Sequence, residues 1–386
     1  MHPYSDVAIA AACNTRQARR LEGHTTQSIS LEAARLLITG TGIERADIDG
    51  IVGEMSKELT YALGIGPVWS STTRAGIRGL LEAAAAIACG LCESVLLVAG
   101  GAGVHGDASM TAPWTRPSHE FVAPFGLYTA AHFAFVARRH MLTYGTKPEH
   151  IATVAATIRN NGSENPDAVY SGRGPFTAQD VLASPMIADP FHRLDCAATT
   201  EGGCAMLVTT AARARSLTST PVYILGAGAD QIGPSYMHPV NWEEPFLGGS
   251  DTPAGYVGRR AARRALSQAG LGIHQMDCLE LYDPFSFEVI RQIEAFGLCE
   301  PGEGGDFVMD GNLDYGSKYP VDTDGGLMSY SHSGTAQLLQ RVIRGVQQIQ
   351  GTCSSRQVPD ASAVLCSNGG SASLFSDVVI LGREGS

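Results

Sequence analysis

"AGIRGLLEAAAAIACGLCESVLLVAGG" (75–101) joins an alanine-rich segment to an apolar run. Up to Gly90 the segment is apolar nearly all round at helical spacing, which predicts a helix buried in the interior rather than one lying on the surface. The run after Glu93 is short and apolar, as in a strand that is buried on both faces. Glu82 and Glu93 interrupt the stretch, so it is not a membrane span.

The order of the predicted elements repeats along the chain. Strand and helix patterns of the first part return from residue 219 onward, and segment 333–351 is a glycine-opened helix equivalent to 75–90. We therefore expect two similar halves, 1–218 and 219–386, from an internal duplication. Between about residues 105 and 190 a Pro-, Ser- and aromatic-rich region predicts an inserted loop domain. The alternation of β and α elements predicts an α/β fold with mostly parallel sheets and helix layers.

Composition excludes several classes of protein. The chain has 386 residues and 27 Lys and Arg against 38 Asp and Glu, which gives a formal net charge of −11. An acidic chain lacks the positive footprint that binds nucleic acid. Nine scattered cysteines form no pair of CxxC motifs, which argues against a zinc site. Without a recognisable secretory leader, we expect reduced thiols and a cytoplasmic location.

The segment "GGLMSYSHSGTAQ" (325–337) has the pattern of a catalytic loop, with two glycines, a Tyr, a His and a glycine that opens a helix. Tyr330 and His332 are two residues apart. In extended backbone, residues two apart point to the same side, so a phenol and an imidazole would face one substrate.

Four segments together resemble the thiolase superfamily, over nearly the whole chain. They are "SPMIADPFHRLDCAATTEGGCAMLV" (184–208), "LELYDPFSF" (279–287), "GGLMSYSHSG" (325–334) and "CSNGGSAS" (366–373). The resemblance implies a five-layer α-β-α-β-α fold, built from two similar halves around a buried helix pair with an inserted loop domain. It also implies a homodimer.

The residue that defines thiolysis is absent. Thiolases use a cysteine at the N-terminus of the buried helix of the first half, where the helix dipole favours thiolate. The equivalent position here is Thr73, and no cysteine lies between Cys13 and Cys89. A threonine hydroxyl without an adjacent base is a poor nucleophile, so we expect no acyl-enzyme. Cys366, near the final glycine loop, is left open as a replacement.

Loss of the cysteine together with the "YSHSG" sequence resembles the steroid side-chain aldolases of the lipid-transfer-protein branch. Those proteins cleave β-hydroxyacyl-CoA by a retro-aldol reaction, together with a small zinc-ribbon and OB-fold partner. The resemblance implies Tyr330 and His332 as acid–base residues, helped by Tyr282 and Asp283. Substrate or oxyanion contacts would come from Thr73, Asn368, Gly369 and Gly370. No cofactor is implied, since coenzyme A is part of the substrate, and no metal is expected in this chain.

Several alternatives stay open at this stage. Either Tyr330 or His332 could be the base, and Asp283 could be a buried carboxylate satisfied by its neighbours. The chain could be a thiolase or acyltransferase with another nucleophile, or a non-catalytic acyl-CoA- or lipid-binding subunit. Residues 123–133 could line a pocket for the acyl group or form the core of the loop domain. The sequence does not identify the acyl group.

Overall fold

The computed structural model describes residues 4–103, 128–231, 257–370 and 374–383. Its main feature is a ladder of nine strands in the order β3 (Trp69–Ser71), β2 (Gly50–Val52), β4 (Ser94–Gly101), β7 (Gly202–Thr210), β1 (Val7–Asn14), β8 (Val222–Gln231), β11 (Phe375–Gly382), β10 (Ala363–Gly370) and β9 (Cys278–Glu280). The β1–β8 link is short, with only Ala8 opposite Tyr223 and Ile9 opposite Val222. The strands up to β7 and those from β8 on therefore form two groups.

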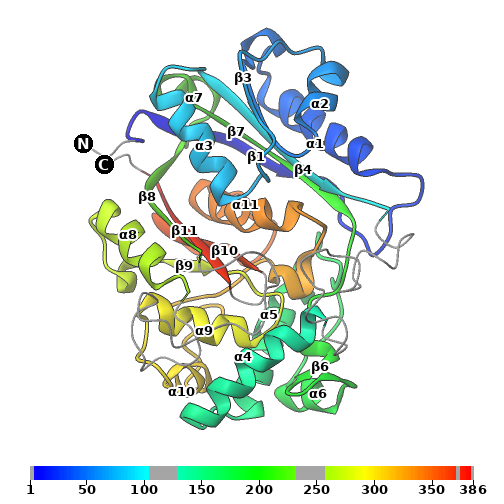
Figure 1. The fold of residues 1–386 in the computed structure, drawn as a ribbon, viewed down its shortest axis with the longest axis vertical. Coiled ribbons are helices and arrows are strands. Elements are labelled where there is room, and N and C mark those ends of the chain that lie inside the picture. The colour runs from blue at the N-terminus through cyan, green and yellow to red at the C-terminus, as the bar shows by residue number, and fades with distance from the viewer. Residues whose placement is uncertain (1–3, 104–127, 232–256, 371–373, 384–386) are drawn as a thin grey trace.

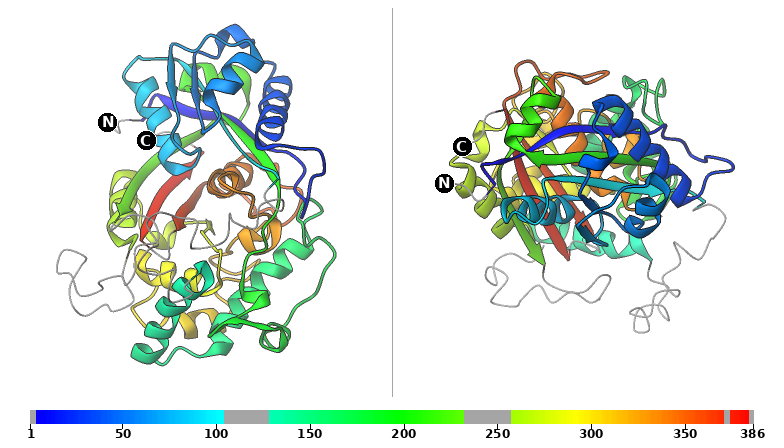
Figure 2. Two further views of the ribbon diagram at one scale, coloured as in Figure 1. Left: turned by 45° about the vertical axis from the view of Figure 1, so that its right-hand side comes forward. Right: turned by 90° about the horizontal axis from the view of Figure 1, so that it is seen from above.

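Helices form three layers around these two groups of strands. The central layer holds α3 (Ile77–Ala88) and α11 (Ala336–Gln350), and both helices contact strands of both groups (Figures 1 and 2). The outer layers are α1 (Thr26–Thr41), α2 (Ser56–Leu63) and α7 (Ala211–Leu217) on one side, and α8 (Arg259–Ala269) and α9 (Phe287–Phe296) on the other. The order of layers is α-β-α-β-α, as the resemblance implied.

The two central helices differ in burial. Every turn of α11 is enclosed, and even Arg341 and Arg344 are almost without solvent contact. In α3, Glu82, Ala85 and Ala88 form an exposed stripe. The alanine-rich helix thus lies in the interior layer, as predicted, but one stripe of it is exposed, whereas its counterpart is enclosed. Alanine misleads here because it is the best helix former on a surface as well as a small apolar residue in a core.

The expected preponderance of parallel strands is also wrong. Only β2 with β3, β2 with β4 and β9 with β10 pair in parallel, whereas β4–β7, β7–β1, β1–β8, β8–β11 and β11–β10 are antiparallel. Parallel neighbours need a crossover that returns the chain to the same end of the sheet. The long insertion between β4 and β7 and the short link between β10 and β11 do not do this.

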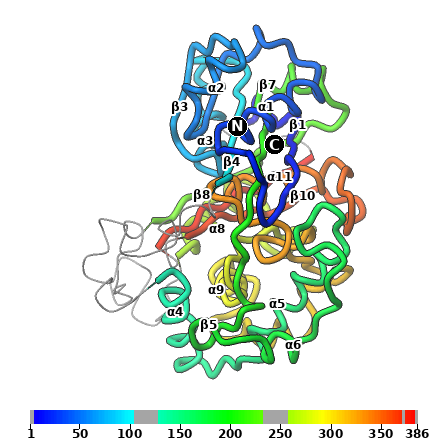
Figure 3. Tube along the Cα trace, turned by 90° about the vertical axis from the view of Figure 1, so that its right-hand side faces the viewer, coloured from blue at the N-terminus to red at the C-terminus, as the bar shows by residue number. Residues whose placement is uncertain are grey.

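The inserted segment forms its own group of elements at the far end from α2 (Figure 3). It contains α4 (Thr129–Tyr144), α5 (Pro148–Ser163), α6 (Ala178–Ala183) and the hairpin β5 (Met186–Ala188) to β6 (Phe191–His192), with α10 (Gly304–Met309) packed on α5. Of the candidate pocket 123–133, residues 123–127 lie outside the described residues. Phe133 is buried with its ring centroid 4.7 Å from that of Phe285, which favours the core alternative there.

Candidate active site

The loop that carries Tyr330 and His332 begins with two glycines in the left-handed region, at φ 106° for Gly325 and φ 60° for Gly326. Glycine adopts these angles without steric cost. A Cβ on Gly326 would also collide with the carboxylate of Asp283. The chain then makes a π-helical turn, η9 (Gly326–Tyr330), before it becomes extended at Ser331. The sequence therefore needs both glycines to set the direction of this loop.

Asp283 holds this turn in place. Its side chain is fully buried, and Oδ1 and Oδ2 accept hydrogen bonds from the backbone amides of Leu327 (2.6 Å) and Met328 (3.2 Å). Burial raises the pKa of Asp283 to about 6, against the opposing effect of Arg341. Because both oxygens bond the loop, the geometry favours the satisfied-carboxylate alternative for Asp283.

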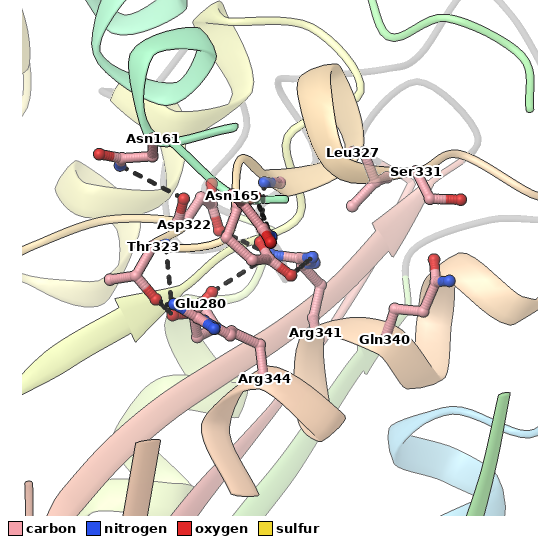
Figure 4. A network of polar contacts seen from close by, with 12 residues as sticks. Asn161, Asn165, Glu280, Asp322, Thr323, Leu327, Ser331, Gln340, Arg341 and Arg344 are labelled. Atoms are coloured by element: carbon pink, nitrogen blue, oxygen red, sulfur yellow. Dashed lines mark hydrogen bonds and ion pairs between the residues drawn. The ribbon is translucent and has the colours of Figure 1, made fainter. Parts of the chain in front are cut away.

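A buried arginine on helix α11 also holds the loop that carries Tyr330 and His332. The guanidinium of Arg341 makes a bidentate pair with Asp324 at 2.8 and 2.7 Å and also reaches Glu280 at 3.2 Å (Figure 4). Oδ1 of Asp324 in turn accepts the backbone amide of Gly326 at 2.9 Å. The central helix α11 is thus connected through Asp324 to the first turn of the loop.

The three acids around Arg341, which are Glu280, Asp322 and Asp324, differ in pKa because their environments differ. Burial raises the pKa of Glu280 to about 7 and that of Asp322 well above its ordinary value. Burial also disfavours the charge on Asp324, but Arg341 outweighs it and lowers the pKa of Asp324. The cluster therefore contains one well-paired carboxylate, and it retains protons on neighbouring acids near neutral pH.

His332 is fixed through its backbone. Its N–H donates to Oγ1 of Thr200 at 2.8 Å, and its carbonyl accepts from the amide of Thr200 at 3.3 Å, beside an isolated bridge to Thr199. The side chain is half-buried, and burial lowers the pKa of the imidazole to about 4. At neutral pH the ring is therefore uncharged and has a lone pair that can accept a proton.

Tyr330 lies in a different environment. It is 4% exposed and lies on the wall of a cleft of about 740 Å³ that Asp167 and Asp324 also line. Burial raises the pKa of the phenol well above its ordinary value, and the two carboxylates add to this effect. A phenol in this setting keeps its proton at neutral pH and acts as a hydrogen-bond donor.

The strand alternation from which we expected this pair to face one substrate is absent at Tyr330. Tyr330 is the last residue of the π-helical turn, so the backbone leading to it is not extended. The residues that line its cleft do not include His332. Side-chain periodicity of two applies only in strands, and the glycine-initiated turn replaces a strand here.

Tyr282 lies against the final glycine loop. A Cβ on Gly369 would lie 2.8 Å from Cδ1 of Tyr282, and one on Gly370 would lie 3.6 Å from its hydroxyl oxygen. The backbone amide of Tyr282 donates to Oγ of Ser367 at 3.0 Å. The ring therefore covers the two glycines closely, and a side chain at Gly369 would displace it.

Thr73 and Asn368 line one small cavity of about 200 Å³ at the start of α3. Oδ1 of Asn368 accepts the amide of Ile77 at 2.9 Å, and its Nδ2 donates to the carbonyl of Leu338 at 2.7 Å. Oγ1 of Thr73 donates to Glu82 at 2.8 Å. Thr73 thus lies just before α3, where the sequence placed it, and both side chains bond protein groups there.

The described residues place no thiol at the start of α3. Cys366 lies in the middle of β10, is fully buried and would have its Sγ 2.5 Å from a Cβ on Gly345. Burial raises its pKa well above the ordinary value. Cys89 is exposed at the opposite end of α3. Cys366 therefore lacks the exposure and thiolate character of a nucleophile.

Within the described ranges, no group of three or more His, Cys, Asp or Glu side chains is placed to hold a metal ion. None of the helices in this part of the chain is long and apolar enough to cross a membrane.

Sequence reasoning did not find the residues that hold the loop. Arg341, Asp324 and Thr200 carry no motif of their own. A signal was present at the central helix, where Arg341 and Arg344 share one face of 333–351 with Gln337 and Gln348. Charges inside a buried helix need partners, and the acids before the glycine pair, at 322–324, are the nearest candidates.

Comparisons with known proteins agree with this geometry. The family described as Thiolase C-terminal domain-like matches residues 251–383. A steroid side-chain-cleaving aldolase of Thermomonospora curvata is 30% identical over an alignment 385 residues long that covers 94% of this chain and 95% of that protein. An acetyl-CoA acetyltransferase of Methanothermobacter thermautotrophicus is also 30% identical, over 98% of this chain and 100% of that one.

A solved structure, the "Ltp2-ChsH2(DUF35) aldolase", matches with a TM-score of 0.87 and 28% identity over 98% of each chain. Human mitochondrial 3-ketoacyl-CoA thiolase shares the fold, with a TM-score of 0.67 at 14% identity and 98% coverage of both chains. The five layers and the central helix pair are thus a thiolase fold. This chain belongs to the thiolase superfamily, and its similarity to the aldolase of Thermomonospora curvata over nearly the full length assigns it to the lipid-transfer-protein branch.

Proposed function

We propose that this chain is a carbon–carbon lyase that cleaves a bulky β-hydroxyacyl-CoA by a retro-aldol reaction. The observation that carries the proposal is Thr73 at the start of α3, where the described residues provide no thiol. His332 and Tyr330, in contrast, are present in the protonation states that acid–base chemistry needs. The aldolase of Thermomonospora curvata, by its name, cleaves steroid side chains, which supports a steroid side-chain CoA ester as the substrate.

A second relative narrows the substrate class. A 17-hydroxy-3-oxo-4-pregnene-20-carboxyl-CoA lyase of Mycobacterium tuberculosis is 34% identical over 62% of this chain and 59% of that protein. The compound in that name has a tertiary alcohol β to a thioester. We infer a substrate of the same class, which gives a ketone and a shortened acyl-CoA.

The reaction divides between a base and a donor. A base removes the proton of the β-hydroxyl, the Cα–Cβ bond breaks, and its electron pair becomes an enolate stabilised by the thioester carbonyl. Neutral His332, with its pKa lowered to about 4 by burial, is assigned as the base. We assign Tyr330, whose phenol stays protonated, as a donor to a substrate that extends from His332 into the cleft at Tyr330, and Tyr282 beside the glycine loop is a further candidate. The proton then passes to the enolate carbon, so no cofactor is needed.

An acyltransferase is the second candidate, since the relative from Methanothermobacter thermautotrophicus has that name. It would need a nucleophile that the described residues do not provide at the start of α3. Cys366 is buried in the core between the strand groups. A non-catalytic acyl-CoA- or lipid-binding subunit is the third, and it would leave His332 and Tyr330 without a role.

We also propose a homodimer and a small partner with a zinc-ribbon and OB fold, in the cytoplasm. The edge strand β3 ends the nine-strand ladder, and Val68 directly before it is exposed, which is consistent with pairing of two copies there. The solved Ltp2-ChsH2(DUF35) aldolase carries a second subunit in its name, which supports a partner of this kind.

The test is a cleavage assay with 17-hydroxy-3-oxo-4-pregnene-20-carboxyl-CoA, with and without a co-expressed OB-fold subunit. Release of a ketone and a shortened acyl-CoA that is lost in His332→Ala and Tyr330→Phe supports the lyase. Condensation of two molecules of acetyl-CoA with release of one free coenzyme A, measured in parallel, instead supports the acyltransferase. Binding of the thioester without turnover supports the binding subunit.

A further inference from the structure

A chain of buried hydrogen bonds runs from the first strand to the backbone of His332. Oε1 of Gln17, just beyond β1, accepts from Oγ of Ser331 at 2.8 Å, and Oγ of Ser331 lies 2.9 Å from Oγ1 of Thr200. Oγ1 of Thr200 then accepts the amide of His332 at 2.8 Å. All three side chains are at most 8% exposed. These hydrogen bonds therefore connect the N-terminal strands with the loop that carries His332 in the second half.

The groups at the two ends of this series of hydrogen bonds, the amide of His332 and Oε1 of Gln17, fix which atom donates in each bond. The amide of His332 can only donate, and Oε1 of Gln17 can only accept. Nε2 of Gln17 is oriented by two carbonyls, those of Thr15 at 2.8 Å and Gly203 at 3.2 Å. Thr200 must therefore donate to Ser331, and Ser331 to Gln17. Each hydroxyl both donates and accepts once, which leaves little freedom to rotate.

We propose that Thr200 and Ser331 are positioning residues for His332, with Gln17 as their fixed end. This inference rests on the proposed lyase function, in which His332 is the base. The chain touches His332 at its backbone amide, directly beside the side chain that must reach the β-hydroxyl. An error of about 1 Å in the place of a catalytic group can cost roughly 10²-fold in rate.

The test compares Thr200→Val, which keeps the shape and removes the hydroxyl, with Thr200→Ser, which keeps the hydroxyl. With the CoA ester named above and any OB-fold subunit present, Thr200→Val should lower kcat by about 10- to 100-fold with KM changed by less than about twofold. Thr200→Ser should retain kcat within about threefold. Ser331→Ala should give a loss in the same direction. Equal melting temperatures of the two Thr200 variants exclude a folding defect.

A second readout is independent of turnover. The ¹³Cε1 signal of His332, assigned by its loss in His332→Asn, should move in Thr200→Val and stay in place in Thr200→Ser, while the signal of buried His140 stays in place in both. Wild-type kcat in Thr200→Val, or equal loss in both variants, overturns the inference. If the wild-type protein does not cleave the ester, the lyase proposal fails. The His332 signal alone then decides whether the hydrogen bonds through Thr200 and Ser331 position this residue.

Discussion

The side-chain oxygen of Asn368 accepts the backbone amide of Ile77 at 2.9 Å, across 291 residues of sequence. This bond joins the last glycine loop to the start of α3, where thiolases carry their nucleophile. The N-terminal amides of a helix have no partner within the helix, and here a side chain from the other half supplies one. The position that lost its cysteine is therefore still organised as the start of a helix.

Replacing Asn368 should destabilise the protein. Asn368→Ala leaves the buried amide of Ile77 without its partner, which costs about 1–3 kcal/mol, and also removes the hydrogen bond to the carbonyl of Leu338. We expect the free energy of unfolding in urea to fall by at least about 1 kcal/mol. Thr72→Ala, at an exposed neighbour of the same cavity, is the surface control and should change it by less than about 0.5 kcal/mol. Equal effects of the two would contradict a capping role.

Gly326 should tolerate no side chain. Gly326→Ala meets two costs, a left-handed φ of 60° and a collision with the Asp283 carboxylate. Gly270→Ala is the matched control, because Gly270 has φ 65° and a Cβ added there would meet no atom within 4 Å. We expect about 1–3 kcal/mol of destabilisation in the control and clearly more in Gly326→Ala. Thermal unfolding measures both, and similar melting temperatures would show that Asp283 can give way.

The order of motifs was enough to predict the fold and the place of Thr73 at the start of the first central helix. The structure adds that Tyr282 covers Gly369 and that Thr73 shares a cavity with Asn368. The hydrogen bonds that link Thr200 and Ser331 to the backbone of His332 could not be predicted in the same way. Thr200 and Ser331 are 131 residues apart, and their hydroxyls meet only because two loops cross there.

Strand direction and the geometry of local turns could not be predicted from the sequence pattern either. The periodicity of an apolar strand is the same in parallel and antiparallel pairs, so sequence patterns did not show that β4 and β7 run in opposite directions. Likewise, two glycines before Tyr330 indicated a turn but not its π-helical form. After this turn Tyr330 lines a cleft together with Asp167 and Asp324.

Stability should fall as pH rises through the range in which Glu280 titrates. Burial raises the pKa of Glu280 to about 7, so the folded state holds a proton there that the unfolded state releases near its ordinary value. More protons bound in the folded state make the free energy of unfolding decrease with pH, by at most about 1.4 kcal/mol per pH unit for one proton. Between about pH 5 and pH 7, wild-type protein should therefore lose stability relative to Glu280→Gln.

Urea unfolding of both proteins at intervals across that range measures the difference. Glu58→Gln on exposed α2 is the control for the same chemical change. A difference that stays constant, or that grows in favour of wild type with rising pH, would be inconsistent with a proton held by the buried cluster.

Alkylation should leave cleavage intact. Cys89 is exposed, whereas Cys366 is fully buried and has a raised pKa, so iodoacetamide should label Cys89 first. Because the proposed mechanism uses no thiolate, labelled enzyme should keep its turnover of the CoA ester. Mass spectrometry identifies the labelled residues, and Cys89→Ser should lose the main site of labelling. Inactivation that follows the labelling of Cys366 would support a thiol-dependent acyltransferase instead of the lyase.

The pH dependence of cleavage tests His332 as the base. Burial lowers the pKa of its imidazole to about 4, and only the neutral ring can accept the β-hydroxyl proton. The profile of kcat/KM reports groups of the free enzyme, so it should stay level down to about pH 5 and fall by up to about tenfold per pH unit below about 4. Circular dichroism at each pH ensures that the protein is still folded. A half-maximal rate near pH 6.5 would mean that the base is an imidazole in ordinary contact with water, and therefore that His332 is not buried when it acts.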